Sequence, residues 1–178
     1  MLVAAPLACG ANAWAGEPAA VVRTNAPFPE SIRLTLDQEY PGWKLAPASP
    51  AVLKEYKAHQ VAHSPSVVTG DFNRDGKKDY VIQIALMTPG QEEQIVIAFL
   101  AQNDGYDEVI LQSMGLDPSV YLWTSNKDLL LVLGGPVGDT AYAFDDGRFH
   151  EVPLPENAEL PPFMVPRPPD PAPERMEP

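Results

Sequence analysis

Cysteine and positive charge are both scarce in this chain of 178 residues. The single cysteine, Cys9, lies close to the N-terminus, so the rest of the chain can form no disulfide and offers no thiol nucleophile. Only 12 basic residues oppose 24 acidic ones, which gives a net charge of −12, and no basic stripe stands out. This balance argues against binding to nucleic acid or to an anionic membrane surface.

Proline is scarce only in the middle of the chain. Residues 51–150 contain four of the 21 prolines, whereas residues 1–50 contain seven and residues 151–178 contain ten. The middle therefore has an ordinary globular composition, and we predict a single β-rich domain over residues 27–154. Proline fixes φ and removes a backbone donor, so we expect residues 155–178 to be a disordered, Pro-rich tail.

Charged side chains are absent from residues 1–15, which read MLVAAPLACGANAWA. This apolar stretch ends in an A-x-A pattern at Ala15 and resembles a secretory signal peptide that lacks its positive leading region. It is shorter than the roughly 20 residues that span a bilayer. We predict a signal over residues 1–15, a linker over 16–26, and a periplasmic or secreted protein without a transmembrane segment. Lipid attachment to Cys9 is the alternative.

The apolar spacing predicts two short helices, over residues 27–40 and 50–60. From Ser66 onward, segments rich in β-branched and aromatic residues predict strands, joined by turns of which two contain Asp-Gly. The expected strands are residues 66–72, 79–87, 94–102, 106–112, 119–124, 128–134, 140–145 and 148–153. We therefore expect a mainly β, α+β fold: an antiparallel meander curled like a propeller blade, with one or two short N-terminal helices.

Oxygen-bearing side chains recur at alternate positions between the first two expected strands. Positions 1, 3, 5 and 9 of this loop are occupied by Asp71, Asn73, Asp75 and Asp79. Gly76, at position 6, can supply a sharp turn. Calcium takes six to eight oxygen ligands at about 2.3–2.6 Å, and alternate residues in a tight loop would direct their oxygens at one centre. The pattern predicts a calcium site.

The rest of the ligand set differs from that of an EF-hand. The main-chain carbonyl of Lys77 is the next expected ligand, and Asp79 is expected to close the site. An EF-hand requires a bidentate acid at position 12, but that position is Ile82, inside an apolar strand. A second possibility is a hairpin loop held by side-chain-to-backbone hydrogen bonds alone.

The segment VTGDFNRDGKKDYVI resembles the calcium loop of FG-GAP and VCBS repeats, and the following IVIAFLAQNDGY is similar to the later strands of such a repeat. The resemblance covers about residues 66–106, a single repeat. It implies a structural calcium ion and a binding role, as in integrin-α-type propellers and many secreted bacterial proteins. Pro41-Gly42-Trp43 and the late FDDGRF segment also resemble small exported bacterial proteins that carry one such loop.

Two functional hypotheses follow. The first is an exported, non-enzymatic, monomeric protein that binds calcium with a Kd on the order of 10⁻⁴ M and recognises a protein or a glycan. The second is a small secreted hydrolase or enzyme inhibitor with an unrecognised site. His59 and His63 have the spacing of a helical zinc pair, but Ser64-Pro65 should end the helix, so we expect surface or capping roles for both.

Overall fold

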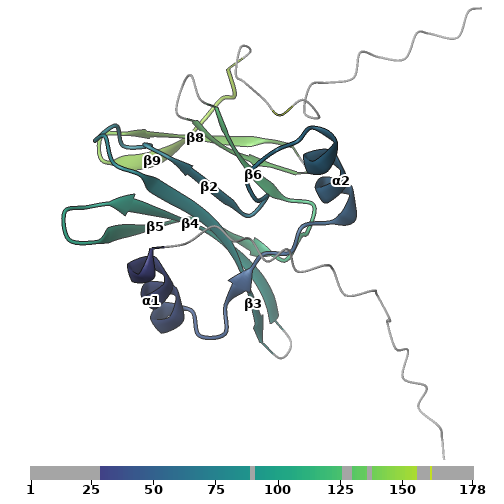
Figure 1. Ribbon diagram of the computed structural model, residues 1–178, viewed down its shortest axis with the longest axis horizontal. Helices are drawn as coiled ribbons and strands as arrows, with labels where there is room; N and C mark the ends of the chain where they lie inside the picture. Colours follow the sequence, from purple (N-terminus) through teal and green to yellow (C-terminus); the bar gives the residue numbers. More distant parts are fainter. Residues whose placement is uncertain (1–28, 89–90, 126–129, 136–137, 156–160, 162–178) are drawn as a thin grey trace, which may run out of the picture.

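The computed structural model describes residues 29–88, 91–125, 130–135, 138–155 and 161 (Figure 1). Two helices and nine strands follow one another in this part of the chain: α1 (Glu30–Glu39), β1 (Lys44–Leu45), α2 (Pro50–Ala58), β2 (Val67–Gly70), β3 (Asp79–Thr88), β4 (Gln91–Ala101), β5 (Tyr106–Gly115), β6 (Tyr121–Ser125), β7 (Leu130–Gly134), β8 (Thr140–Asp145) and β9 (Arg148–Val152). Neither helix is long and apolar enough to cross a bilayer. The predicted signal peptide, the linker and most of the predicted tail lie outside the described residues.

Both expected helices form, and local sequence explains where they begin and end. Ser49 caps α2, because its hydroxyl accepts a hydrogen bond from the N–H of Val52, and Pro50 occupies the first turn, where no backbone donor is needed. α1 ends at Glu39 with Tyr40 as its C-cap residue, and Gly42 then adopts a left-handed conformation with φ of 82° that redirects the chain into β1.

The strands form two antiparallel sheets. The first contains five strands in the order β1-β3-β4-β5, and β2 also pairs with β3; the second has the order β6-β7-β8-β9. The prediction of an antiparallel, mainly β fold with two short N-terminal helices is confirmed. The expected meander is divided between the two sheets, and Pro118 lies in the connection from β5 to β6, where its carbonyl accepts the Ser49 N–H at 2.6 Å.

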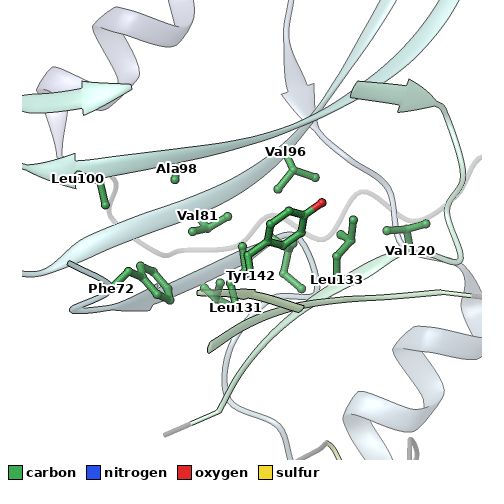
Figure 2. Close-up of a cluster of buried hydrophobic side chains, with 11 residues drawn as sticks. Phe72, Val81, Val96, Ala98, Leu100, Val120, Leu131, Leu133 and Tyr142 are labelled. Atoms are coloured by element: carbon green, nitrogen blue, oxygen red, sulfur yellow. The ribbon is translucent and has the colours of Figure 1, made fainter. Parts of the chain in front are cut away.

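The two sheets pack face to face around one hydrophobic core (Figure 2). Side chains from β3 and β4 meet side chains from β7 and β8 across this interface, as strand alternation requires. The buried members of this inter-sheet core are Val68, Phe72, Val81, Val96, Ala98, Leu100, Val120, Leu122, Leu131, Leu133 and Tyr142. Phe72 belongs to the predicted calcium loop, so the loop is anchored in the core.

The helices occupy opposite sides of the molecule (Figure 1). Ile32 and Leu36 of α1 pack on the face of the five-stranded sheet that points away from the inter-sheet core. Val52 and Tyr56 of α2 pack instead against Tyr121 of the four-stranded sheet. The fold therefore has three layers: α1, then the five-stranded sheet, then the four-stranded sheet. α2 packs at one end of the four-stranded sheet.

Candidate metal centre

The predicted calcium loop connects β2 to β3 as one end of an antiparallel pair. Gly70 lies opposite Asp79 in the register, so residues 71–78 form the whole connection. Two residues of the loop adopt left-handed conformations, Arg74 with φ of 60° and Gly76 with φ of 80°. The position of Gly76 agrees with the sharp turn expected from the sequence, whereas the left-handed Arg74 was not anticipated.

Two of the predicted ligand side chains, those of Asp71 and Asn73, converge on the backbone N–H group of Asp75. This N–H donates to Oδ1 of Asp71 at 2.9 Å and to Oδ1 of Asn73 at 3.2 Å, so both oxygens lie beside a single donor. Oδ2 of Asp71 accepts the Gly76 N–H at 3.0 Å, and Oδ1 of Asp75 accepts the Lys77 N–H at 2.9 Å. The structure therefore brings the side-chain oxygens of Asp71 and Asn73 together at the backbone of Asp75, whose own carboxylate bonds to the Lys77 N–H.

Asp79 occupies a different environment, because its side chain is fully buried. Its Oδ2 accepts the N–H of Phe72 and its Oδ1 accepts the N–H of Ala101, both at 2.8 Å. Burial raises the pKa of Asp79 above its ordinary value; the backbone N–H groups of Ala101, Phe72 and Asn73 oppose this increase, and the charge of Asp75 adds to it. Asp79 thus ties both ends of the loop to the end of β4.

Lys77 supplies positive charge next to the acidic side chains. Its ammonium group lies 3.7 Å from Oδ2 of Asp75 and donates to Oδ1 of Asn103 at 3.1 Å, in the turn between β4 and β5. Lys77 therefore links the loop to this turn, and Asp79 links it to Ala101 at the end of β4, just before the turn. The predicted role of the Lys77 carbonyl as a ligand stays a prediction.

The predicted ligands are of the chemical types that bind calcium. Carboxylate, amide and carbonyl oxygens are the ligands of a hard cation, and each carboxylate oxygen has a second lone pair besides the one used in the bonds above. Across the described ranges, no three His, Cys, Asp or Glu side chains form a group that could hold a metal. That finding covers neither amide nor main-chain oxygens, so it does not decide the calcium hypothesis.

The two histidines considered from the sequence have separate environments. His59 caps the end of α2, and its Nε2 lies 3.7 Å from Glu55. The ring of His63 lies 5.0 Å from that of Trp123, and burial lowers the pKa of His63 below its ordinary value while the Ser64 carbonyl opposes this effect. The structure thus supports a capping role for His59 and a packing role for His63.

Two features of the structure, one at the loop and one at α2, were not predicted from the sequence. The first is the pair of contacts from Asp79 to Ala101 and from Lys77 to Asn103, which join residues 22 and 26 positions apart. The second is an aromatic cluster at the end of α2, formed by Tyr56, His63, Tyr121 and Trp123. Neither has a local sequence signal, because both depend on how distant strands are brought together.

Comparison with known proteins adds no relative: no family model, curated protein or solved structure matches the chain.

Proposed function

We propose that the chain is an exported, non-enzymatic binding protein in which residues 71–79 hold one structural Ca²⁺. The observation that carries the proposal is the convergence of Asp71 and Asn73 on the N–H group of Asp75. This arrangement gathers two oxygen-bearing side chains in a tight loop that also carries the Asp75 carboxylate, and such oxygens are the kind of donor that calcium uses.

The charge of the loop supports a bound cation. Asp71, Asp75 and Asp79 bring three carboxylates into nine residues, and Asp75 contributes to the raised pKa of the buried Asp79. The Lys77 ammonium, at 3.7 Å from Asp75, offsets part of this charge. A divalent cation would offset more of it and would favour the ionised form of Asp79.

A structural ion at this position would stabilise more than the loop itself. Asp79 bonds to Ala101 at the end of β4, and Lys77 bonds to Asn103 in the following turn. Fixing residues 71–79 would therefore also fix the β4–β5 turn on the five-stranded sheet. We propose that the ordered surface serves a periplasmic or secreted monomer that recognises a protein or a glycan, with a lipid anchor at Cys9 as the alternative to free export.

Thermal unfolding with and without calcium tests this proposal. An ion that binds only the folded state stabilises it by about 1.4 kcal/mol at a tenfold excess over Kd. This corresponds to a melting temperature higher by roughly 3–6 °C for a domain of this size. Magnesium should produce a smaller increase, because it demands a tighter octahedron of oxygens. A chelator should reverse the effect.

A matched pair of substitutions localises the response. Asp75→Asn keeps an oxygen that can accept the Lys77 N–H but removes one ligand charge, so the apparent calcium affinity should fall by about tenfold or more. Asp146→Asn removes the same charge from the β8–β9 turn, at a left-handed position that asparagine tolerates, and should leave the response unchanged. Equal calcium responses in the two variants would refute the assignment to residues 71–79.

A further inference from the structure

β5 forms an accessible edge of the five-stranded sheet. It pairs with β4 on one side, and within the described part of the chain no strand pairs with its other side. None of its ten residues is buried, whereas residues 94–101 of β4 are all buried. The opposite edge of the sheet consists of two shorter strands, β1 with two residues and β2 with four. β5 is therefore the long free edge of this sheet, and such edges can pair with another chain.

The backbone of the first half of β5 is oriented for pairing with a further strand. The N–H of Gln102 donates to the carbonyl of Gly105 at 2.8 Å, which makes these facing residues a hydrogen-bonded pair. Facing residues alternate between hydrogen-bonded and non-hydrogen-bonded pairs along an antiparallel ladder. The backbone N–H and C=O groups of Tyr106, Glu108 and Ile110 therefore point away from β4.

An apolar side chain is exposed at the centre of this edge. Ile110 is 56% exposed, and it lies on the α1 side of the sheet because it pairs with Ile97, which packs beneath α1. The register between β4 and β5 shifts between Val96 and Ile97, which leaves Leu111 as an extra residue in β5. Such a bulge interrupts the regular edge, so a further strand has residues 106–110 to pair with.

Two carboxylates beside Ile110 lack a cationic partner. Asp107 accepts the side-chain amide of Gln102 at 2.7 Å, and Glu108 accepts the hydroxyl of Tyr40. Neither acid forms a salt bridge with any described residue, and β5 itself contains no lysine or arginine. Neutral groups thus hold both carboxylates in place and leave their charge uncompensated. In a chain with a net charge of −12, this edge is complementary to a basic partner.

We propose that β5 binds an extended, basic segment of another protein, which adds to the five-stranded sheet as a further antiparallel strand along residues 106–110. The outward backbone groups supply the main-chain hydrogen bonds, and the side chains supply specificity. Antiparallel pairing places an apolar residue of the segment opposite Ile110 and basic residues opposite Glu108 and Asp107. The preferred order is therefore apolar, any residue, basic, basic. This site rests on the binding role proposed above, but it does not require the calcium ion.

Hydrogen exchange followed by NMR tests the placement. The probe is a synthetic peptide of repeated Val-Thr-Lys-Lys units, and excess chelator is present so that failure of the calcium proposal leaves this result unchanged. At saturation the peptide should slow exchange of the outward amides of Tyr106, Glu108 and Ile110 by about tenfold or more. A peptide with proline in place of each valine has the same charge but weaker pairing, and should not.

Three outcomes of the exchange experiment would overturn the proposal. The first is no slowing by the valine peptide, and the second is equal slowing by both peptides, which would indicate attraction by charge alone. The third is that these amides are already protected in the free monomer, because a segment of the same chain would then occupy the edge.

A substitution at the exposed apolar residue tests the side-chain contribution. Ile110→Lys adds a like charge and removes the apolar contact, so it should weaken binding of the valine peptide by about tenfold or more. Leu34→Lys is the matched control, because Leu34 is 54% exposed on α1, and it should bind like the wild type. Equal affinities of the two variants contradict the site. A wild-type dimer that Ile110→Lys converts to a monomer in size-exclusion chromatography also contradicts it, because a second copy would then occupy the edge.

The contribution of charge is tested with substitutions that keep the acceptor oxygens. Asp107→Asn combined with Glu108→Gln removes both charges and should weaken binding of the valine peptide by about fivefold. Asp145→Asn combined with Asp146→Asn removes the same charge from the exposed β8–β9 turn and should leave the affinity unchanged. If both double variants lose affinity to the same extent, the peptide responds to net charge and the assignment to β5 fails.

Discussion

Asp79 is the residue whose removal should damage the loop most, even without calcium. Its carboxylate is fully buried and accepts the N–H groups of Phe72 and Ala101, each at 2.8 Å. Asp79→Ala deletes both bonds and leaves two donors in a buried environment. Phe72 is 1% exposed and Ala101 is 7% exposed, so water cannot readily replace the missing acceptor.

The magnitude follows from the number of groups left without a partner. Each buried donor that loses its acceptor costs about 1–3 kcal/mol, which gives about 2–6 kcal/mol for the pair. Burial also penalises the ionised carboxylate, as its raised pKa shows, and the substitution relieves that penalty. We therefore expect a loss in the lower part of the range, about 2–4 kcal/mol. This is a large share of the 5–15 kcal/mol that stabilises a typical domain.

Urea unfolding at neutral pH with excess chelator measures this loss without any contribution from calcium. Asp104→Ala is the matched control, because Asp104 is an exposed aspartate in the neighbouring β4–β5 turn and its replacement should cost less than about 0.5 kcal/mol. If Asp79→Ala also costs less than about 0.5 kcal/mol, Asp79 does not hold the loop to β4 and the reasoning is refuted.

Three further predictions concern the turn, the titration and the N-terminus. Gly76→Ala should destabilise by about 1–2 kcal/mol in urea, because φ is 80°, whereas Gly115→Ala should cost less. Burial raises the pKa of Asp79 above its reference value of 3.8, so the protonated carboxyl contributes to the stability of the fold at low pH. This contribution is lost as the pH rises from about 4 through the folded-state pKa. The free energy of unfolding of the wild type should therefore fall more steeply with pH in this range than that of Asp79→Asn. Mass spectrometry of the native protein should find an N-terminus near Gly16, and an intact Met1 would contradict export.

The secondary structure could be predicted because its signals are local. The period of apolar residues predicted the two helices, and the structure adds a local cap at Ser49 for the second. The Asp146-Gly147 dipeptide produced the expected tight hairpin, with φ of 48° and 76°, the two positive values that a type I′ turn requires. The division into two sheets was not predicted, because it depends on which strands pair and pack across the core rather than on any single strand.

The candidate site could be predicted only in part, because some of its features are local in sequence and others depend on tertiary contacts. The alternation of Asp71, Asn73 and Asp75 is a local pattern, and in the structure the side chains of Asp71 and Asn73 both accept the backbone N–H of Asp75. Asp79 was expected to face the same centre, but its burial and its bond to Ala101 result from tertiary contacts. A sequence pattern can place an acid in a loop, but it does not reveal which backbone donors the folded sheet will present to it.

Calorimetric titration of the purified chain with calcium at neutral pH tests the central claim most directly. The account predicts one ion per chain, with a Kd on the order of 10⁻⁴ M, and no measurable binding in the Asp75→Ala variant. The absence of saturable heat in the wild type up to about 10 mM calcium, beyond the range of extracellular modules, would contradict the claim. Unchanged binding in Asp75→Ala would contradict it equally, because the ion would then lie elsewhere.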